Sequence, residues 1–494
     1  MIQIFQNSLP YAEKTAIISE GKTYSYTDLH QASANFAHLL LDDSDDLAEG
    51  RVAFMVNPGF DYVRVQWGIW QAGGIVVPLC LSYPLPSLRY TIENSGASVI
   101  VVSPEFEGML ADLAQELNCR FIILGKNDTA KLSKKLPEVI DERGAMILYT
   151  SGTTNLPKGV VSTHGNLNAQ ISSLIEAWKW TSEDSTVCVL PLHHVHGVVN
   201  VVSCSLWAGA SCEFMPNFSE KAIYELIEKQ KINVFMAVPT IYFKLITYWE
   251  ALAKDKQIEL TNALAKLRLM ISGSAALPVS VMERWKAIST HLLLERYGMT
   301  EIGMALSNPY DGPRVAGHVG YPLPGVSARI SDEGEIQIKG PTVFKEYWNK
   351  PESTAESFTE DGWFKTGDIA AIDELGGYRI LGRNSVDIIK SGGYKISALE
   401  IEEVLRQYPG IADCSVVGLP NDEWGELVAA AIVTKGPVDE KALNTWMREQ
   451  MPAYKSPRKY TVLAELPRNA MGKVTKKDVA VSYTHLTLPT ICSV

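Results

Sequence analysis

Short apolar segments alternate with segments of helical periodicity along the first part of this chain. Strands are expected at 51–56, 75–79, 98–102 and 121–124, and a helix is expected at 61–71. Consecutive parallel strands need a crossover connection, and the usual crossover is a helix. The alternation therefore predicts an α/β fold built on parallel sheets.

Three later apolar segments, at 232–238, 267–272 and 292–297, are each followed by small or hydroxyl-bearing residues. In an open parallel sheet, ligands bind where the carboxyl ends of the strands meet the loops. Several such ends along one edge predict a single large binding site.

The chain of 494 residues is expected to divide into a large and a small domain. Short strands beyond residue 317 indicate a β-rich, barrel-like region that closes the large domain, residues 1–382. Residues 383–480 have the pattern of a compact α+β domain of roughly 100 residues. The terminal segment 481–494 has no periodic partner, so we interpret it as a non-native tail that matches no element.

Charge and cysteine usage limit the partners and the compartment. The net charge is −11, which disfavours non-specific binding to nucleic acid or to an anionic membrane. The seven cysteines include no Cys-x-x-Cys pair, which indicates a reducing compartment and no zinc site. No apolar segment reaches transmembrane length, and no targeting pattern precedes the first strand. We therefore expect a cytoplasmic protein without an obligate protein partner.

A loop dense in hydroxyl groups lies between two expected strands, at 145–149 and 160–163. Small residues let backbone N–H groups approach a phosphate, hydroxyls add donors and a lysine adds charge. The spacing differs from the common P-loop, because a proline precedes the lysine and a glycine follows it. The candidate phosphate-binding residues are Thr150, Ser151, Gly152, Thr153, Thr154 and Lys158.

The string at 146–159 closely resembles the phosphate-binding loop of the acyl-adenylate-forming (AMP-binding) enzymes, which include acyl-CoA synthetases, adenylation domains and luciferases. Matching motifs follow at 297–301, 361–368 and 467–473, so the resemblance covers the chain to about residue 480. It implies a large domain of stacked α/β lobes, a small mobile C-terminal domain, and ATP, Mg²⁺ and coenzyme A as cofactors and co-substrates.

The resemblance also assigns roles to individual residues. Thr300 would bond the α-phosphate of ATP, Glu301 would hold Mg²⁺, and Lys473 would be the adenylation lysine. Asp368 and Arg383 would face the ribose, although one additional residue stands between Arg383 and Asp387 compared with many relatives. Other nucleotide contacts would be Gly273, Ser274, Ala275, Tyr297 and Gly298, and the thioester-forming segment would contain Gly392 and Gly393.

Three histidines, His193, His194 and His196, follow an expected strand at 186–192. Two of them are spaced i, i+2, which suits one face of a strand. No nearby cysteine or carboxylate completes a metal site, so we expect the histidines to line a pocket. We assign a catalytic role to His194 and a substrate-binding role to His196.

Arg296 is the residue that carries the substrate hypothesis. The surrounding strings resemble those of the malonyl-CoA synthetases within this family, and a buried guanidinium without an anionic partner would be costly. A short dicarboxylic acid would supply that partner through a bidentate pair. In the alternative interpretation, Arg296 pairs internally with Glu295 or Glu301. The candidate substrate residues are Arg296, Lys244, His196 and Met304.

Other functions remain open at this point. The chain could be a ligase for short or medium monocarboxylic acids, a stand-alone adenylation domain that loads a carrier protein, or a non-catalytic nucleotide-binding protein. The histidine stretch contains no aspartate for an α-amine, and Lys158, Glu301, Asp368 and Lys473 are all retained. These observations favour the acid–CoA ligase.

Overall fold

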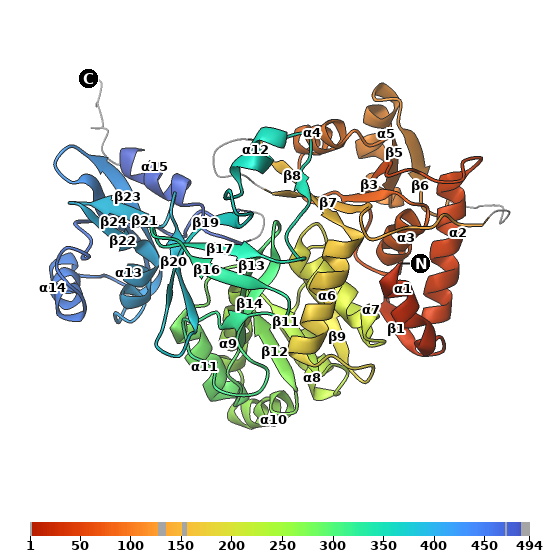
Figure 1. The fold of residues 1–494 in the computed structure, drawn as a ribbon. Helices are drawn as coiled ribbons and strands as arrows, with labels where there is room; N and C mark the ends of the chain where they lie inside the picture. The colour runs from red at the N-terminus through yellow and green to blue at the C-terminus, as the bar shows by residue number, and fades with distance from the viewer. Residues whose placement is uncertain (1, 127–134, 151–155, 470–471, 486–494) are drawn as a thin grey trace, which may run out of the picture.

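The computed structural model describes residues 2–126, 135–150, 156–469 and 472–485 (Figure 1). The large N-terminal part is built on two sheets that enclose one layer of helices. The small C-terminal part carries its own sheet and lies at one end of the molecule. The expected α/β class is confirmed.

The first sheet contains the strands on both sides of the hydroxyl-rich loop. Its central strands are parallel, and their alternate residues face opposite layers, so Val52 and Phe54 enter the inner core while Ala53 and Met55 face outward. Helices α4 (Leu85–Ser95) and α5 (Glu107–Glu116) cover the outer face. The strand order is β18 (Glu346–Tyr347), β8 (Lys158–Thr163), β7 (Gly144–Thr150), β4 (Ile75–Pro78), β3 (Arg51–Met55), β5 (Val99–Val102) and β6 (Arg120–Ile123).

The second sheet supplies the other strand ends that border the site. Its outer face is covered by α8 (Glu220–Glu228), α9 (Pro239–Glu250), α10 (Lys254–Leu264) and α11 (Val279–Ser289). The strand order is β15 (Tyr321–Pro322), β14 (Gly303–Ser307), β13 (Leu294–Met299), β12 (Leu269–Ser272), β11 (Val234–Ala237), β9 (Ser185–Cys188), β10 (Ser211–Phe214), β1 (Thr15–Ser19) and β2 (Lys22–Ser25).

Helices packed between the two sheets form the main core. Helix α3 (Phe60–Gln71) contacts β4 of one sheet and β1 of the other, and α6 (His164–Trp178) likewise contacts β8 and β14. The fully buried Trp67 and Trp178 come from these two helices. The other elements of this part are α1 (Gln3–Ser8), η1 (Leu9–Tyr11), α2 (Tyr26–Leu41), η2 (Pro104–Phe106), η3 (His196–Ser203), α7 (Cys204–Trp207) and α12 (Pro351–Glu356).

The segment that carries the histidines differs from the expected strand. Strand β9 ends at Cys188, and a π-helix, η3, begins at His196. The prediction of a strand to residue 192 with two histidines on one face is therefore wrong. An apolar run alone does not distinguish a strand from a buried irregular segment, because both hide the same side chains.

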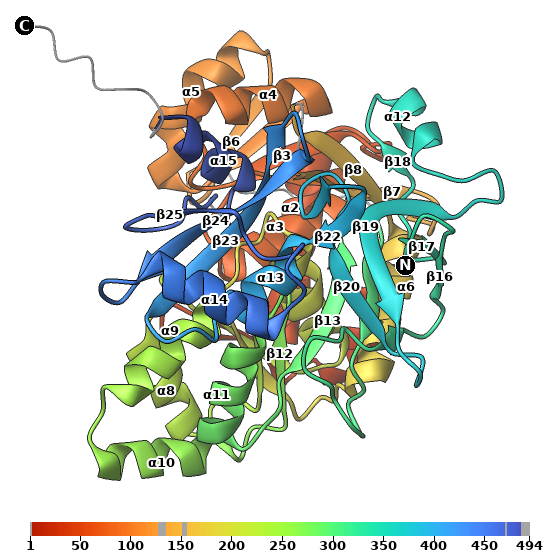
Figure 2. The same ribbon diagram turned by 90° about the vertical axis from the view of Figure 1, so that its left-hand side faces the viewer.

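The β-rich region forms an antiparallel sheet, with the order β16 (Ser327–Ile330), β17 (Glu335–Lys339), β19 (Phe364–Ile372) and β20 (Tyr378–Arg383). The small domain follows directly, as Figure 2 shows from the side. Its elements are β21 (Ile388–Ser391), β22 (Tyr394–Ser397), α13 (Ala398–Leu405), β23 (Ile411–Asn421), β24 (Gly425–Thr434), α14 (Glu440–Gln450), β25 (Lys459–Val462) and α15 (Lys476–His485). The domain boundary at residues 382 and 383 stays a prediction.

Helix α15 continues past residue 480. Tyr483 is buried and packs in one cluster with Val479 and Leu466. Val479 and Tyr483 are four residues apart and so lie on one face of the helix. The expectation that the terminal segment matches no element is wrong for residues 481–485. Residues 486–494 lie outside the described part, and the non-native origin of the tail stays a prediction.

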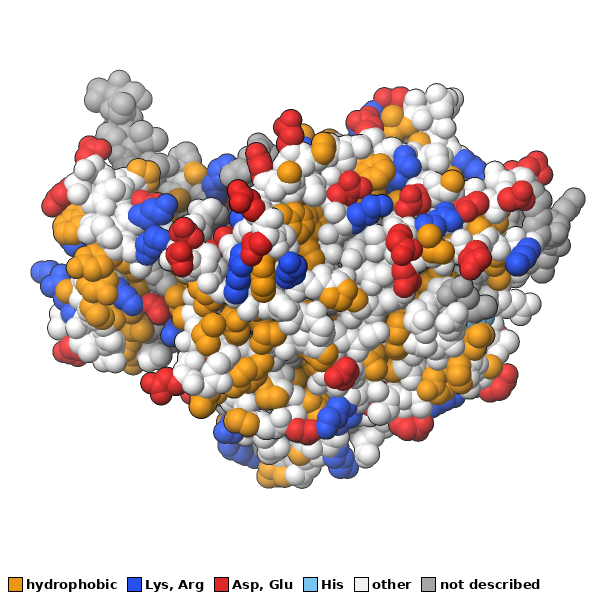
Figure 3. Space-filling model, viewed as in Figure 1, with side chains coloured by type: hydrophobic (Ala, Val, Ile, Leu, Met, Phe, Trp, Pro, Cys, Tyr) orange, Lys and Arg blue, Asp and Glu red, His pale blue; other side chains and the backbone are white. Residues whose placement is uncertain are grey.

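Acidic and basic side chains are interspersed over the face shown in Figure 3, where no large area carries charge of one sign. Within the described ranges, the helices are too short or too polar for any of them to traverse a lipid bilayer.

Candidate active site

Most of the residues singled out in the sequence line one cavity of about 670 Å³ between the large and the small domain. The strand ends of the second sheet, the hairpin of β7 and β8, and the C-terminal lysine segment meet there. Its lining includes Thr150, Lys158, His194, His196, Lys244, Ser274, Ala275, Arg296, Gly298, Thr300, Glu301, Met304, Arg383 and Lys473.

The remaining candidates occupy other positions. Tyr297 and Asp368 are bonded to each other beside the cavity, and Gly273 lies under the guanidinium of Arg296. Gly392 and Gly393 form the turn between β21 and β22 and do not line the cavity. The predicted loop residues outside the described part of the chain are Ser151, Gly152, Thr153 and Thr154.

Glu301 lines the cavity together with Lys158 and Tyr347. Its Oε1 accepts a hydrogen bond of 3.0 Å from the hydroxyl of Tyr347, and the Nζ of Lys158 lies 4.6 Å from the centroid of the same tyrosine ring. Burial raises the pKa of the Glu301 carboxyl. Tyr347 was missed in the sequence, because it stands alone between motifs and only the pairing of β18 with β8 brings it here.

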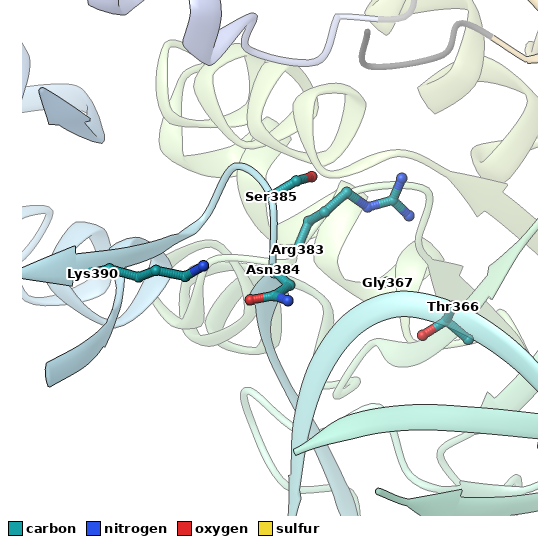
Figure 4. A pocket seen from close by; sticks show the side chains of 6 residues that line it. All are labelled: Thr366, Gly367, Arg383, Asn384, Ser385 and Lys390. Carbon is teal, nitrogen blue, oxygen red and sulfur yellow. The ribbon is translucent and has the colours of Figure 1, made fainter. Parts of the chain in front are cut away.

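Asp368 and Arg383 meet because they face each other on the paired strands β19 and β20. The Nε of Arg383 donates to Oδ1 of Asp368 at 2.9 Å, and the hydroxyl of Tyr297 donates to Oδ2 at 2.6 Å. Figure 4 shows the guanidinium of Arg383 on the side of Thr366 and Gly367, in a second pocket of about 400 Å³ at the domain junction. The predicted ribose-binding pair is thus preassembled.

Lys473 enters the cavity from the small domain. Burial lowers the pKa of its ammonium group, as do the guanidinium groups of Arg383 and Arg296, while the carboxylates of Asp368 and Asp387 oppose this change. Cations brought together in a buried cavity repel one another and favour an anionic ligand. The arrangement therefore suits a polyphosphate.

Arg296 is 4% exposed and lies with Ser274 and His196 at one end of the cavity, which we call the acyl end because the substrate hypothesis assigns the acid to it. Its Nε is buried and has no hydrogen-bond partner in the part of the chain described here, and its Nη2 donates to Oγ of Ser274 at 3.4 Å. A Cβ at Gly273 would lie 2.4 Å from its Cζ, so the guanidinium lies close against the backbone of that glycine. Burial lowers the pKa of Arg296 to about 9.

Neither acidic neighbour named in the sequence forms an ion pair with Arg296. Glu295 is adjacent on strand β13 and so points to the other face, where its Oε1 accepts from the backbone N–H of Leu277 at 3.1 Å. Burial raises the pKa of Glu295 to about 8. Against the effect of burial, Glu295 raises the pKa of Arg296 without bonding to it. Because Glu301 bonds to Tyr347, neither carboxylate forms an ion pair that would prevent Arg296 from binding an anionic ligand.

The histidines are neutral at physiological pH. Burial lowers the pKa of His194 to about 3, with smaller contributions from His193 and Lys473, and it lowers the pKa of His196 well below its usual value. Among the described residues, no group of three or more histidine, cysteine or carboxylate side chains could hold a metal ion. His194 lies toward Lys473, and His196 lies toward Arg296.

Met304 and Lys244 also line the cavity. The backbone N–H of Met304 donates to Oε1 of Gln170 at 3.0 Å, and Nε2 of Gln170 donates to Oδ1 of Asn200 at 3.4 Å. This pair of buried amides connects the backbone at Met304 to η3. The sequence analysis missed it, because buried amides have no characteristic spacing. The Nζ of Lys244 lies 5.7 Å from the ring centroid of Phe218.

Two family models match this chain: "AMP-binding enzyme" over residues 5–348 and "AMP-binding enzyme C-terminal domain" over residues 400–473. The chain is 42% identical to a mitochondrial malonate–CoA ligase, ACSF3, of Xenopus laevis, covering 98% of this chain and 92% of that protein. It is 40% identical to the malonate–CoA ligase of Arabidopsis thaliana, covering 97% and 88%.

Two solved structures of similar enzymes also match this chain over nearly its whole length. ATP-bound MatB from Rhodopseudomonas palustris superposes with a TM-score of 0.90 at 33% identity, covering 99% of this chain and 100% of that one. The o-succinylbenzoate CoA synthetase of Bacillus subtilis in complex with AMP superposes with a TM-score of 0.84 at 25% identity, covering 97% of this chain and 98% of that one.

Proposed function

Because the chain belongs to the family of AMP-binding enzymes, we propose that it is an ATP-dependent malonate–CoA ligase. The reaction converts malonate, ATP and coenzyme A to malonyl-CoA, AMP and diphosphate. The full-length similarity to malonate–CoA ligases supports the reaction and the substrate. It also supports ATP and coenzyme A as the co-substrates.

The observation that carries the choice of substrate is the unpaired guanidinium of Arg296. A monocarboxylic acid would leave this cation buried without an anion, which is costly. Malonate presents a second carboxylate one methylene away from the reacting one. That carboxylate can form a bidentate pair with the guanidinium, the geometry in which arginine binds carboxylates most strongly.

In the first half-reaction, a carboxylate oxygen of malonate attacks the α-phosphorus of ATP, and diphosphate leaves. Negative charge then accumulates on the transferring phosphoryl oxygens, and cations held in place before the reaction stabilise it. Among the cations that line the cavity, we assign this task to Lys158 and Lys473, with Thr300 as an additional donor. Asp368 and Arg383 hold the ribose.

Glu301 would hold the magnesium ion that accompanies ATP. Mg²⁺ takes oxygen ligands and is commonly bound by one or two protein carboxylates together with substrate phosphates. The cavity fits this requirement, because Glu301 is a buried carboxylate that lines it close to Lys158. The ion supplies charge neutralisation at the phosphates.

In the second half-reaction, the thiolate of coenzyme A attacks the carbonyl carbon of malonyl-adenylate, and AMP leaves. We propose that the small domain rotates between the two steps and brings Gly392 and Gly393 to the acyl end. Glycines there would let the narrow pantetheine arm pass close to the backbone. Lys473 would leave the cavity in the same movement.

Exchange of radioactive diphosphate into ATP tests this proposal. The purified full chain is assayed with malonate, butyrate, acetate and an amino acid, followed by detection of the CoA thioester. We expect malonate to give the fastest exchange and malonyl-CoA as the product. Faster exchange with butyrate or acetate would contradict the substrate but keep the acid–CoA ligase. Absence of exchange with every acid would support a non-catalytic nucleotide-binding protein.

The compartment is a separate proposal. All cysteines in the described part of the chain are free, among them Cys80, Cys119 and Cys188, which agrees with a reducing environment. We place the protein in the cytoplasm on this basis. Cell fractionation with an antibody to the chain tests it, and recovery in an organelle fraction would contradict it.

A further inference from the structure

Ser274 lies between two polar side chains at the acyl end of the cavity. Its Oγ is 3.0 Å from Nδ1 of His196 and 3.4 Å from Nη2 of Arg296. Its backbone φ is +70°, in the left-handed region that side chains other than glycine, asparagine and aspartate rarely adopt. Residues held in such conformations cluster at functional sites. The serine hydroxyl is therefore a candidate for a specific task.

Chemistry fixes the direction of the hydrogen bond from Arg296, whereas the direction of the bond to His196 depends on the tautomer of the imidazole. A guanidinium has donors only, so the oxygen of Ser274 accepts from Arg296. The hydroxyl hydrogen then has one partner within reach in the described residues, the Nδ1 of His196. Burial and the neighbouring Arg296 hold the pKa of His196 low, so this imidazole is neutral and one ring nitrogen can accept. We therefore expect His196 to carry its hydrogen on Nε2, which is buried and has no hydrogen-bond partner among the described residues.

The backbone below the guanidinium completes the arrangement. Gly273 leaves room for Arg296, because a side chain at that position would begin 2.4 Å from its Cζ. The guanidinium therefore rests on Gly273 and is bonded to Ser274, and its Nε has no partner among the described residues. Donors not used by the protein are available to an anion.

We propose that Ser274, held by His196, is a positioning residue that selects a dicarboxylic acid by orienting the guanidinium of Arg296. This inference rests on the proposed function, because it assumes that Arg296 binds the distal carboxylate of malonate. His196 takes the hydroxyl hydrogen, so that a lone pair of Ser274 faces the arginine. Without the hydrogen bond to Ser274, the guanidinium of Arg296 keeps its charge but is no longer held in one orientation.

The first test compares kcat and KM for malonate and butyrate in matched variants. Ser274→Gly and Ser274→Ala both remove the hydroxyl, and the glycine variant does so without backbone strain. In both variants, we expect KM for malonate to rise about 10- to 100-fold, the equivalent of one hydrogen bond to a charged group. The kcat/KM ratio of malonate to butyrate should fall by a similar factor, because butyrate has no distal charge to place.

His196 provides the rescue experiment. His196→Asn places an amide oxygen where Nδ1 stood and can still accept from Ser274, whereas His196→Leu cannot. We expect the asparagine variant to keep most of the preference for malonate and the leucine variant to lose it. An equal loss in both variants, or equal changes for malonate and butyrate in the Ser274 variants, would overturn the proposal.

A spectroscopic measurement separates this proposal from the proposed function. In ¹⁵N-histidine-labelled protein, the resonances missing from His196→Asn identify His196, and we expect an unprotonated Nδ1 and a protonated Nε2. A proton on Nδ1 would overturn the proposed hydrogen bond from Ser274 to His196, and with it the positioning role of Ser274, even if malonate is the substrate. If the wild-type chain prefers butyrate, the proposed function fails whatever the tautomer, and the selection of a dicarboxylic acid fails with it.

Discussion

At the scale of single residues, Arg296 is the most informative side chain for the substrate. Arg296→Met keeps much of the stem volume and removes the charge. We expect malonate to lose about 2–5 kcal/mol of transition-state binding, the range for truncating one partner of a buried charge pair. Butyrate should improve relative to malonate, and the affinity for ATP should hold, because the nucleotide contacts come from other residues.

The measurement for this variant is kcat/KM for malonate and for butyrate in both proteins. If both values fall by the same factor, Arg296 supports the structure of the site and does not discriminate between malonate and butyrate. Arg268→Met is a suitable control, because Arg268 directly precedes strand β12 of the same sheet and neither it nor its partner, Asp184, lines the cavity. That variant should change both acids equally.

Glu295 makes a separate prediction about stability and pH. Burial raises its pKa from 4.5 to about 8, so the folded protein holds a proton that the unfolded chain releases above about pH 4.5. Folding stability therefore falls as the pH rises from about 4.5 to about 8 and is not reduced further by this group above that. Glu295→Gln keeps an acceptor for the N–H of Leu277 and removes the titration.

Urea unfolding of wild type and Glu295→Gln at about pH 5, 7 and 8.5 checks this prediction. We expect the stability difference to shift in favour of the glutamine variant by a few kcal/mol as the pH rises, from the linkage of one shifted group. A constant difference over this range would show that Glu295 stays ionised in the folded protein.

At the scale of elements, helix α15 shows how a local pattern is overlooked. Four of the ten residues of α15 are apolar, but three of them are consecutive, at 479–481, so the sequence shows no helical spacing that marks Val479 and Tyr483 as one buried face. Their partners Val417, Ala429 and Leu466 come from distant parts of the small domain. The packing of α15 was therefore visible only in three dimensions.

Truncation experiments test the role of this helix. A chain ending at Ala480 loses the buried Tyr483, and we expect its melting temperature to fall by a few degrees relative to the full chain, from about 1–3 kcal/mol of lost aromatic burial. A chain ending at His485 is the matched control and should melt like the full chain. Equal melting of the two truncated chains would show that residues 481–485 contribute nothing.

Other elements were predictable because one rule decided them. The strands β3, β4, β5 and β6 lie within one or two residues of the expected segments. The first three are buried parallel strands, which are nearly continuously apolar, and the edge strand β6 is apolar after its exposed first residue, Arg120. The π-helix η3 was not predictable, because its sequence satisfies the same requirement. At the site, motif residues such as Lys158 and Glu301 were found because their motifs resemble those of the family, whereas Tyr347 and Gln170 were missed because tertiary pairing alone brings them there.

At the scale of the whole molecule, the two domains hold the arrangement suited to adenylate formation. The small domain contributes Lys473 to the cavity, while Gly392 and Gly393 remain outside it. Glu403 of α13 accepts a hydrogen bond of 3.1 Å from the backbone N–H of Val279, at the first turn of α11 in the large domain. A carboxylate at a helix N-terminus is favourable, so this contact stabilises the observed arrangement.

The arrangement makes the two half-reactions separable by one substitution. Lys473→Ala removes a buried cation that can act at the developing charge during adenylate formation. We expect diphosphate exchange to fall by about two to three orders of magnitude, the scale for one preorganised electrostatic group. Conversion of supplied malonyl-adenylate and coenzyme A to malonyl-CoA should be nearly unchanged, because the proposed rotation of the small domain would remove the lysine from the cavity before this step.

The matched control for this experiment is Lys477→Ala, a nearby lysine that does not line the cavity and should leave both half-reactions intact. Both rates are measured in single turnover, so that release of product does not mask the chemical steps. If Lys473→Ala slows both half-reactions equally, the lysine acts in both steps, and the segment with Gly392 and Gly393 does not replace it in the cavity. If only the first step slows, one cavity serves two reactions in turn, and the position of the small domain decides which one it catalyses.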